Sequence, residues 1–259
     1  MKRKNFEKEI STAIFEAHAR RFSECLESDV VICGAGPSGL LCAKRLAMRG
    51  LRVTILEKRL APGGGIWGGA MGMPEIVVEE NDGPILKELG IDHSKAGKGL
   101  LLTSAFELAA GLIHCAVKSG ASIMNLVYLE DLVVKEKRIA GVVANRTFIG
   151  ENLPVDPITI ECGAVVDATG HEAVAAALLA KRGLLGKPKG DGIMNARSGE
   201  DFVVEKTGSV YPGLYLSGMS VCSYYGGPRM GPIFGGMLKS GIKAAEQILT
   251  DHPWNNKKK

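Results

Sequence analysis

The chain has 259 residues, of which 46% are hydrophobic and 23% are charged, a composition typical of a globular protein with one large α/β domain, or one domain with an inserted lobe. Its net charge of +4 comes partly from the tail Lys257–Lys259, and no basic stripe for nucleic acid is visible. The N-terminus is too charged for a signal peptide and no apolar run is long enough to span a membrane, so the sequence predicts a cytoplasmic protein.

The six cysteines show neither a CxxC pair nor another spacing typical of a metal site. Most of them lie in apolar runs, as reduced core residues of a cytosolic protein do. They are Cys25, Cys33, Cys42, Cys115, Cys162 and Cys222.

Residues 4–26 form the first predicted element, a helix. Phe6, Ile10, Ile14 and Phe22 fall near one face of it, with charged residues opposite. Such a helix needs a surface to cover, either on its own domain or on another subunit, and the pattern does not decide between the two.

The next stretch is predicted to be a dinucleotide-binding unit. Val30–Cys33 predicts a buried strand, Leu40–Arg49 a helix that Gly50 ends, and Arg52–Leu56 a second strand. Between the first strand and the helix the sequence reads GAGPSG, which suits a backbone that approaches a pyrophosphate. A lone GxGxxG motif is weak evidence, but the flanking strands and helix make this one strong.

Three glycines and one acid are the predicted contacts of this motif. Gly34 permits the turn out of the strand, Gly36 the approach of the phosphates, and Gly39 the close packing of helix on strand. Glu57 lies 23 positions after Gly34, where an acid accepts hydrogen bonds from ribose hydroxyls. An acid at this position favours NAD or FAD over NADP.

A glycine-rich segment, GGGIWGGAMGMPEIV, follows at residues 63–77. Gly63–Gly65 stand where several flavin-type nucleotide proteins place a second glycine pair that lets the loop pass close to the cofactor. Trp67 and Met73 lie among the glycines, in a stretch with neither a helical nor a strand pattern. An apolar lid over a ligand and a tight structural loop remain as alternatives.

The middle of the chain predicts two helices and a hairpin. The helices are expected at residues 84–90 and 103–119. Residues 120–136 are expected to form a strand that turns back near Glu136–Arg138.

The last third predicts two more strands and a closing helix. A strand at Cys162–Asp167 ends in ATG and His171, and a strand at Leu214–Ser217 leads through a glycine-rich loop into the long helix. Flavoproteins of this architecture usually carry an acid at the position of Met219. Its absence argues against a tightly bound flavin.

These elements predict an α/β, Rossmann-like dinucleotide-binding fold of the two-dinucleotide-binding flavoprotein type with an inserted smaller β lobe. Residues 1–259 are expected to be a single domain, with its core at 28–250 and a disordered tail at 251–259.

Six motifs in this order resemble the thiamine thiazole synthase family: GAGPSG, Glu57-Lys58, GGGIWGGAM, VDPITI, DATGH and GPRMGPIFGGML. The resemblance covers the chain from about Glu16 to Leu249. It implies a transferase that consumes NAD: nicotinamide leaves, the ADP-ribose isomerises to a ketone and condenses with glycine, and sulfur is added. The implied product is an adenylated thiazole carboxylate, the thiazole precursor of thiamine, and the implied assembly is a homo-octamer with sites shared between protomers.

The resemblance also implies roles for individual residues. Asp156 and His171 match the pair that binds ferrous iron in sulfide-using members, a carboxylate and an imidazole that suit Fe(II) and leave positions open for substrate. Arg229 matches the residue that binds the glycine carboxylate, which a guanidinium fits at two points. These three residues are the expected catalytic set. The matched nucleotide contacts are Ser38, Glu57, Lys58, Gly65, Val127, Pro154, Val155 and Met219.

Pro154 departs from the family pattern. Eukaryotic members place there a cysteine that gives up its sulfur, and archaeal sulfide-using members carry histidine. Proline can neither donate sulfur nor bind a metal, and no nearby cysteine replaces it. We therefore predict that sulfur comes from free sulfide, with Fe(II) assisting and many turnovers per chain, and a paralogue with altered chemistry stays open.

Three other functions fit parts of the sequence. An FAD-dependent oxidoreductase is opposed by Met219. A sensor of NAD or ADP-ribose would have no need of a metal pair or of Arg229, and an isomerase of phosphorylated sugars could reuse the ADP-ribose isomerisation step. Four histidines belong to no pattern with chemical meaning: His18, His93, His114 and His252.

Overall fold

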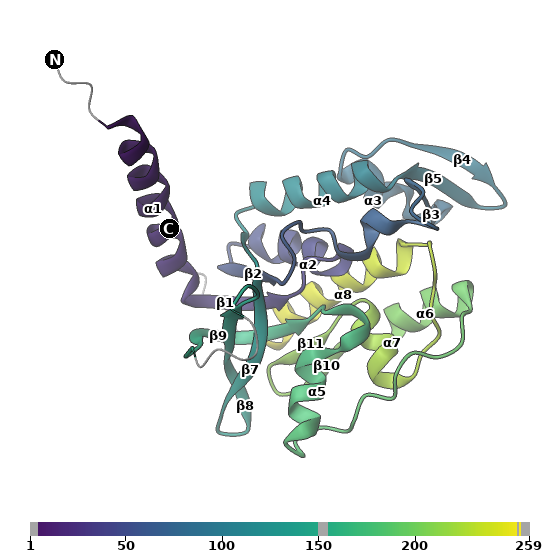
Figure 1. Cartoon of the computed structure of the whole chain (residues 1–259). Helices are drawn as coiled ribbons and strands as arrows, with labels where there is room; N and C mark the ends of the chain where they lie inside the picture. The colour runs from purple at the N-terminus through teal and green to yellow at the C-terminus, as the bar shows by residue number, and fades with distance from the viewer. Residues whose placement is uncertain (1–4, 150–154, 253, 255–259) are drawn as a thin grey trace.

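The computed structural model describes residues 5–149, 155–252 and 254, and its centre is a mixed eight-stranded β-sheet (Figure 1). Six strands follow in the order β10-β11-β9-β1-β2-β6, and the hairpin β7–β8 joins them because β8 pairs with β9. β11, β9, β1, β2 and β6 run parallel. The strands are β1 (Glu27–Cys33), β2 (Val53–Glu57), β6 (Ser122–Asn125), β7 (Val127–Lys135), β8 (Arg138–Arg146), β9 (Ile158–Asp167), β10 (Gly208–Tyr211) and β11 (Leu214–Leu216).

The central strand β1 is buried on both faces. Val30 and Ile32 belong to the apolar core that three helices share, and Val31 belongs to the core on the other face, with the β7–β8 hairpin and α5. A parallel strand covered on both sides explains the continuous apolar run in the sequence. The predicted Rossmann-like α/β class is confirmed. The helices named here are α2 (Pro37–Ala47), α4 (Ala105–Lys118) and α8 (Gly235–Asp251) on the first face and α5 (Val174–Lys181) on the second.

A second, three-stranded sheet forms a smaller β lobe beside α3 (Gly83–Glu88) and α4 (Figure 1). Its order is β3-β5-β4, with bounds Glu75–Glu79, Leu100–Ser104 and His93–Gly97. Residues 103 and 104, predicted as the start of a helix, end β5 instead. All five residues of β4, including His93, are exposed, so no alternation of apolar and polar residues marks this strand in the sequence.

The prediction of one strand at residues 120–136 is wrong, because the chain bends at Leu126, whose φ is +56°. β6 before the bend pairs with β2, and β7 after it pairs with β8. The turn between β7 and β8 lies where the hairpin turn was predicted, with left-handed backbone at Glu136 and Lys137.

Two helices in the last third were not predicted. α6 (Ala196–Lys206) packs against α8, and α7 (Met219–Tyr225) occupies the expected glycine-rich loop after β11. Both lie between glycine-rich segments, which obscure the helical spacing of the apolar residues.

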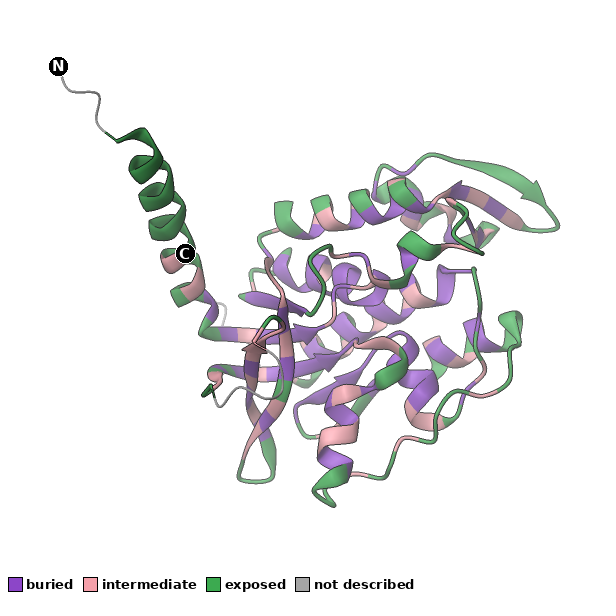
Figure 2. Ribbon diagram, in the orientation of Figure 1, coloured by how far each residue is buried: buried purple, intermediate pink, exposed green. Residues whose placement is uncertain are grey.

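The N-terminal helix α1 (Phe6–Cys25) extends away from the rest of the chain (Figure 2). Cys25 is its only buried residue, and Phe6, Ile10 and Ile14 are 67%, 45% and 66% exposed. The helix does not cover its own domain, which leaves a subunit contact as the interpretation of its apolar residues. Neither α1 nor any other helix in the described part of the chain has the length and apolar character needed to cross a membrane.

The close packing of α2 on α8 depends on a residue without a side chain. A Cβ on Gly241 would lie 2.3 Å from the carbonyl oxygen of Ser38. Gly241→Ala is therefore expected to lower the free energy of unfolding by about 1–3 kcal/mol, because α8 must move away from α2. Denaturant titration measures the effect. The control is Gly68→Ala, whose Cβ would meet no atom within 4 Å, and equal stability of the two variants would contradict this account.

Candidate functional site

A cavity of about 930 Å³ lies near the carboxyl ends of β1, β2 and β9, where open α/β sheets usually bind ligands. Its size is within the range of cofactor pockets. The structure brings ten of the predicted site residues to its wall. They are Gly34, Gly36, Ser38, Glu57, Lys58, Gly65, Val127, His171, Met219 and Arg229.

The glycine motif forms the floor of this cavity at the start of α2. A Cβ on Gly34, whose φ is +105°, would lie 2.3 Å from the carbonyl oxygen of Ala168, so only glycine fits between β1 and β9. Gly36 is the N-cap residue, no side chain caps the helix, and no atom would meet its Cβ within 4 Å. The first amides of α2 are thus available to an anion such as a phosphate. Gly39 does not line the cavity. A Cβ at this position would lie 2.2 Å from the Gly34 carbonyl oxygen, so the glycine allows α2 to pack closely against the turn after β1.

Glu57, the last residue of β2, is held in place by two backbone amides. Its Oε2 accepts a hydrogen bond from the amide of Ala35 at 2.9 Å, and its Oε1 accepts one from the amide of Arg59 at 2.8 Å. Each carboxylate oxygen keeps a further lone pair. The side chain is therefore oriented at the cavity wall and still able to accept hydrogen bonds from two neighbouring hydroxyls.

Lys58 forms an ion pair that the sequence did not indicate. Its Nζ lies 2.6 Å and 2.8 Å from the two carboxylate oxygens of Glu172, which also lines the cavity. The pair joins the end of β2 to the turn η3 (Gly170–Glu172) after β9. Both side chains are about half exposed, so the pair can open when an anionic ligand competes for the ammonium group.

His171 is oriented by a partner that is 20 positions away in the sequence. Its Nδ1 lies 2.5 Å from Oδ2 of Asp191, and its backbone carbonyl accepts a hydrogen bond from Oγ of Ser223 at 2.8 Å. The carboxylate fixes the imidazole and leaves Nε2 for a metal or a substrate, which is the usual support of a metal-binding histidine. Asp191 lies in a loop without any periodic pattern, which is why sequence reasoning missed it.

The turn that carries His171 is built on a buried carboxylate. Asp167 is fully buried and accepts hydrogen bonds from the Thr169 hydroxyl at 2.7 Å, the Ser220 hydroxyl at 3.1 Å and the Ala176 amide at 3.1 Å. Burial raises the pKa of Asp167, and the hydrogen bonds oppose that rise. The DATGH segment is thereby tied to α5 and α7 at once.

Arg229 is positioned by its backbone, which pairs with the segment before α6. Its carbonyl accepts a hydrogen bond from the Asn195 amide at 3.0 Å, and Met194 and Arg229 form an isolated bridge. The residue is exposed and lines the cavity. A guanidinium placed in this way can bind a carboxylate at two points.

Asp156 and Val155 do not line this cavity in the described part of the chain. Asp156 and Val155 are exposed and precede β9, and Pro154 lies outside the described residues. β9 has ten residues, which span about 30 Å in extended conformation, and His171 follows its far end. One chain therefore does not bring Asp156 and His171 to the same ion.

Most of the glycine-rich segment forms a tight loop: residues 63–74 contain the short helix η1 (Gly64–Gly68) and lead into β3 at Glu75. Gly64, Gly65 and Gly69 line the cavity, whereas Trp67 donates a hydrogen bond from Nε1 to the carbonyl of Pro62 at 2.7 Å and stacks near Phe106. Neither Trp67 nor Met73 lines the cavity. Of the two sequence-based interpretations, the structure favours the structural loop.

Comparisons with known proteins identify relatives over most of the chain. The profile of the Thi4 family matches residues 11–234. A thiamine thiazole synthase from Thermococcus kodakarensis is 50% identical over 242 residues, which is 93% of this chain and 96% of the relative, and one from Thermotoga maritima is 47% identical over 240 residues, with 92% and 95% covered. The crystal structure of Thermovibrio ammonificans THI4 superimposes with a TM-score of 0.91 at 41% identity, covering 97% of this chain and 99% of that one.

Proposed function

The chain belongs to the Thi4 family and forms the thiazole of thiamine, and we propose that it makes an adenylated thiazole carboxylate from NAD, glycine and sulfide. The observation that supports this most is the single cavity lined by the glycine motif, Glu57, His171 and Arg229. An anion-binding helix start, a ribose-binding acid, a metal-binding imidazole and a carboxylate-binding guanidinium thus surround one space.

NAD is held by its ADP half in this proposal. The first amides of α2 and the ammonium of Lys58 bind the pyrophosphate, and Glu57 accepts hydrogen bonds from ribose hydroxyls. Val127 and Met219, which are 1% and 9% exposed, supply apolar contacts. These groups keep the ADP-ribose bound after nicotinamide leaves, so the later steps take place on an anchored intermediate.

Arg229 binds the carboxylate of glycine in the same cavity. The two parallel N–H groups of its guanidinium orient the amino acid and leave the amine free to condense with the ketone of the opened ribose. Among the described residues, none forms a hydrogen bond or an ion pair with the side chain of Arg229. The guanidinium can therefore receive this carboxylate without breaking an ion pair.

His171 and Asp156 fit Fe(II) if they come from two chains. Asp191 holds Nδ1 of His171 and leaves Nε2 as the donor. Asp156 is an exposed carboxylate without a hydrogen bond or ion pair to any described residue, so it can reach a neighbouring protomer. Iron held by such a pair supplies Lewis acidity toward a ketone or imine and a binding position for sulfide. The exposed apolar residues of α1 are consistent with the homo-octamer that this sharing of sites requires.

Free sulfide is the sulfur source in this proposal. The only cysteine on the cavity wall among the described residues is Cys33, which is 1% exposed. Burial and the neighbouring Asp167 raise the pKa of the Cys33 thiol well above its ordinary value. A thiol that stays protonated is a poor nucleophile, so Cys33 is not suited to donate its sulfur.

Anaerobic incubation of the purified protein with NAD, glycine, sulfide and Fe(II) tests this function. Several equivalents of adenylated thiazole per chain, followed by mass spectrometry, are expected. Release of nicotinamide without thiazole would show that a chain with Pro154 stops at the ADP-ribose stage. No consumption of NAD would refute the proposal as a whole.

A further inference from the structure

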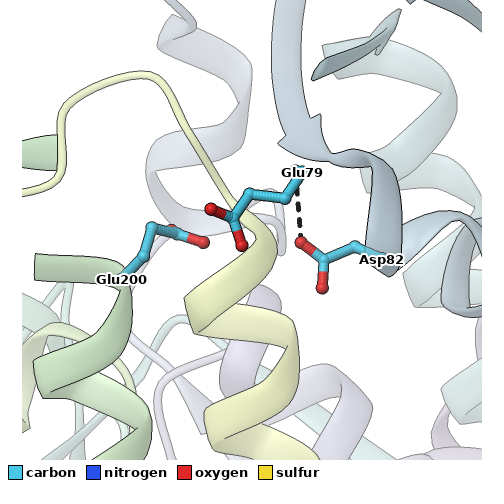
Figure 3. A group of neighbouring side chains, drawn as sticks. All are labelled: Glu79, Asp82 and Glu200. Atoms are coloured by element: carbon cyan, nitrogen blue, oxygen red, sulfur yellow. Dashed lines mark hydrogen bonds between the residues drawn. The ribbon is translucent and has the colours of Figure 1, made fainter. Parts of the chain in front are cut away.

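Three carboxylates from three elements meet outside the set of residues that line the cavity (Figure 3). Glu79 ends β3, Asp82 lies in the short helix η2 (Glu80–Asp82), and Glu200 lies in α6. One oxygen from each lies within 4.8 Å of the others. Asp82 and Glu200 are each 1% exposed, so water does not screen their charges.

One oxygen of this group has no hydrogen-bond partner. Oε2 of Glu200 accepts a hydrogen bond from the Gly236 amide at 2.5 Å, but Oε1 is buried and unpaired among the described residues. A buried carboxylate oxygen without a donor is costly. Figure 3 shows the carboxylate of Glu200 directed toward that of Glu79, another acceptor, which cannot satisfy it unless a cation or a proton lies between them.

The charges around this oxygen do not balance. Lys239 is the one cation that contacts the group among the described residues, with Nζ 3.2 Å from Asp82 Oδ1 and 3.5 Å from Glu79 Oε2. Three carboxylates therefore face one ammonium. Burial raises the pKa of Glu200 to about 7, and the charges of Asp82 and Glu79 add to that rise while Lys239 and the Gly236 amide oppose it. When Glu200 is ionised, the group therefore lacks a positive charge, which either a proton or a bound cation can supply.

The geometry of the oxygens suits a single ion. When three atoms are no more than 4.8 Å apart, some point lies within about 2.8 Å of all of them, close to the 2.3–2.6 Å of calcium–oxygen bonds. The donors are all hard oxygens, and sulfur and imidazole donors are absent from the group. Such a set suits calcium or magnesium and not a soft transition metal.

We propose that Glu79, Asp82 and Glu200 bind a divalent cation of the calcium or magnesium class. The cation ties the three-stranded sheet to α6 and, through the Gly236 amide on Glu200, to the first turn of α8. Phe234, which caps that turn, and Met237, which lies in it, line the cavity, so the site fixes one of the cavity walls. This site uses none of the residues assigned to the thiazole reaction.

Calcium and magnesium chloride, each added to chelator-treated full-length protein, test the site by calorimetric titration and by thermal unfolding. The wild type is expected to bind one equivalent, and Tm to rise by about 5–10 °C when free cation exceeds Kd about 100-fold. Glu200→Gln keeps the size and the acceptor for Gly236 but removes a charge, and it is expected to weaken binding at least tenfold. The matched control is Asp201→Asn, an exposed acid next to it in α6, which is expected to bind like the wild type.

Lys239→Gln provides a second test, in which a gain of cation binding is expected instead of a loss. This change removes the ammonium that competes for Asp82 and Glu79, so cation affinity is expected to rise by about tenfold. Wild-type affinity is expected to fall as pH drops through about 7, because Glu200 then takes a proton. His171→Ala is expected to leave calcium binding unchanged, which separates this site from the proposed iron site.

Absence of a saturable calcium or magnesium effect on the wild type would overturn the proposal. An equal effect in Glu200→Gln would overturn it as well, because the cation would then bind elsewhere. A Glu200→Gln variant more stable than the wild type, with no response of either to cation, would show that the carboxyl holds a proton instead.

Discussion

His171→Ala is expected to lower thiazole formation by about a thousandfold or more. In the proposed mechanism the change removes the imidazole donor to Fe(II). The Lewis acidity of such a metal contributes several kcal/mol to transition-state stabilisation, and each 1.36 kcal/mol is a factor of ten in rate. Anaerobic turnover with NAD, glycine, sulfide and Fe(II) measures the loss. Nicotinamide release, followed in the same reaction, shows whether NAD cleavage survives when sulfur addition fails.

A matched histidine provides the control for this variant. His93 is exposed on β4, away from the residues that line the cavity, so His93→Ala is expected to turn over like the wild type. Asp191→Asn is expected to lie between the two, with about 10–100-fold weaker Fe(II) binding, because the imidazole keeps its place but loses the carboxylate that orients it. Full activity of His171→Ala would remove the histidine from the mechanism.

The dinucleotide half of the site was predictable because its determinants are local in the sequence. The run from Val30 through the glycine motif to Glu57 contains the strand, the turn, the helix and the acid in order, and each follows from the physics of one element. Gly34 and Gly36 of this motif line the cavity, and so does Glu57. Gly39 has the packing role that its position in the motif predicts.

The residues that were missed depend on contacts between distant segments. Asp191 reaches His171 from a loop, Glu172 reaches Lys58 across 114 positions, and Glu200 of α6 meets Glu79 at the end of β3. Single charged residues without a period give no signal in the sequence. The bend at Leu126 was missed for a similar reason, because a non-glycine residue with positive φ interrupts an otherwise continuous strand pattern.

The proposed metal ligands Asp156 and His171 show a third limit of sequence analysis, which concerns how copies of the chain assemble. Asp156 and His171 stand fifteen positions apart, which suggests proximity, but most of that interval is the extended strand β9. Because the strand separates its ends by about 30 Å, neighbours in the motif are far apart in the fold. Under the proposed iron site, an ion bound by both residues would join two copies of the chain. Such a site depends on the oligomer, which the sequence of one protomer does not reveal.

Mixed oligomers of two inactive variants are therefore expected to recover activity. Asp156→Ala and His171→Ala chains, each inactive alone, are co-expressed with different affinity tags and isolated through both tags. If Asp156 of one protomer and His171 of its neighbour form one site, random pairing leaves about a quarter of the sites intact, and thiazole formation should return to about a quarter of the wild-type rate per chain.

A second mixture distinguishes shared sites from sites within one chain. Wild-type chains are mixed equally with the double variant Asp156→Ala/His171→Ala. About a quarter of all sites in the mixture stay intact if the ligands come from two chains, but about half stay intact if one chain supplies both. A quarter in both mixtures establishes the composite site. No activity in the first mixture, together with half of the wild-type activity in the second, would require both ligands to come from one chain. β9 would then have to bend far from its extended course, which its pairing with β1 fixes over residues 161–167.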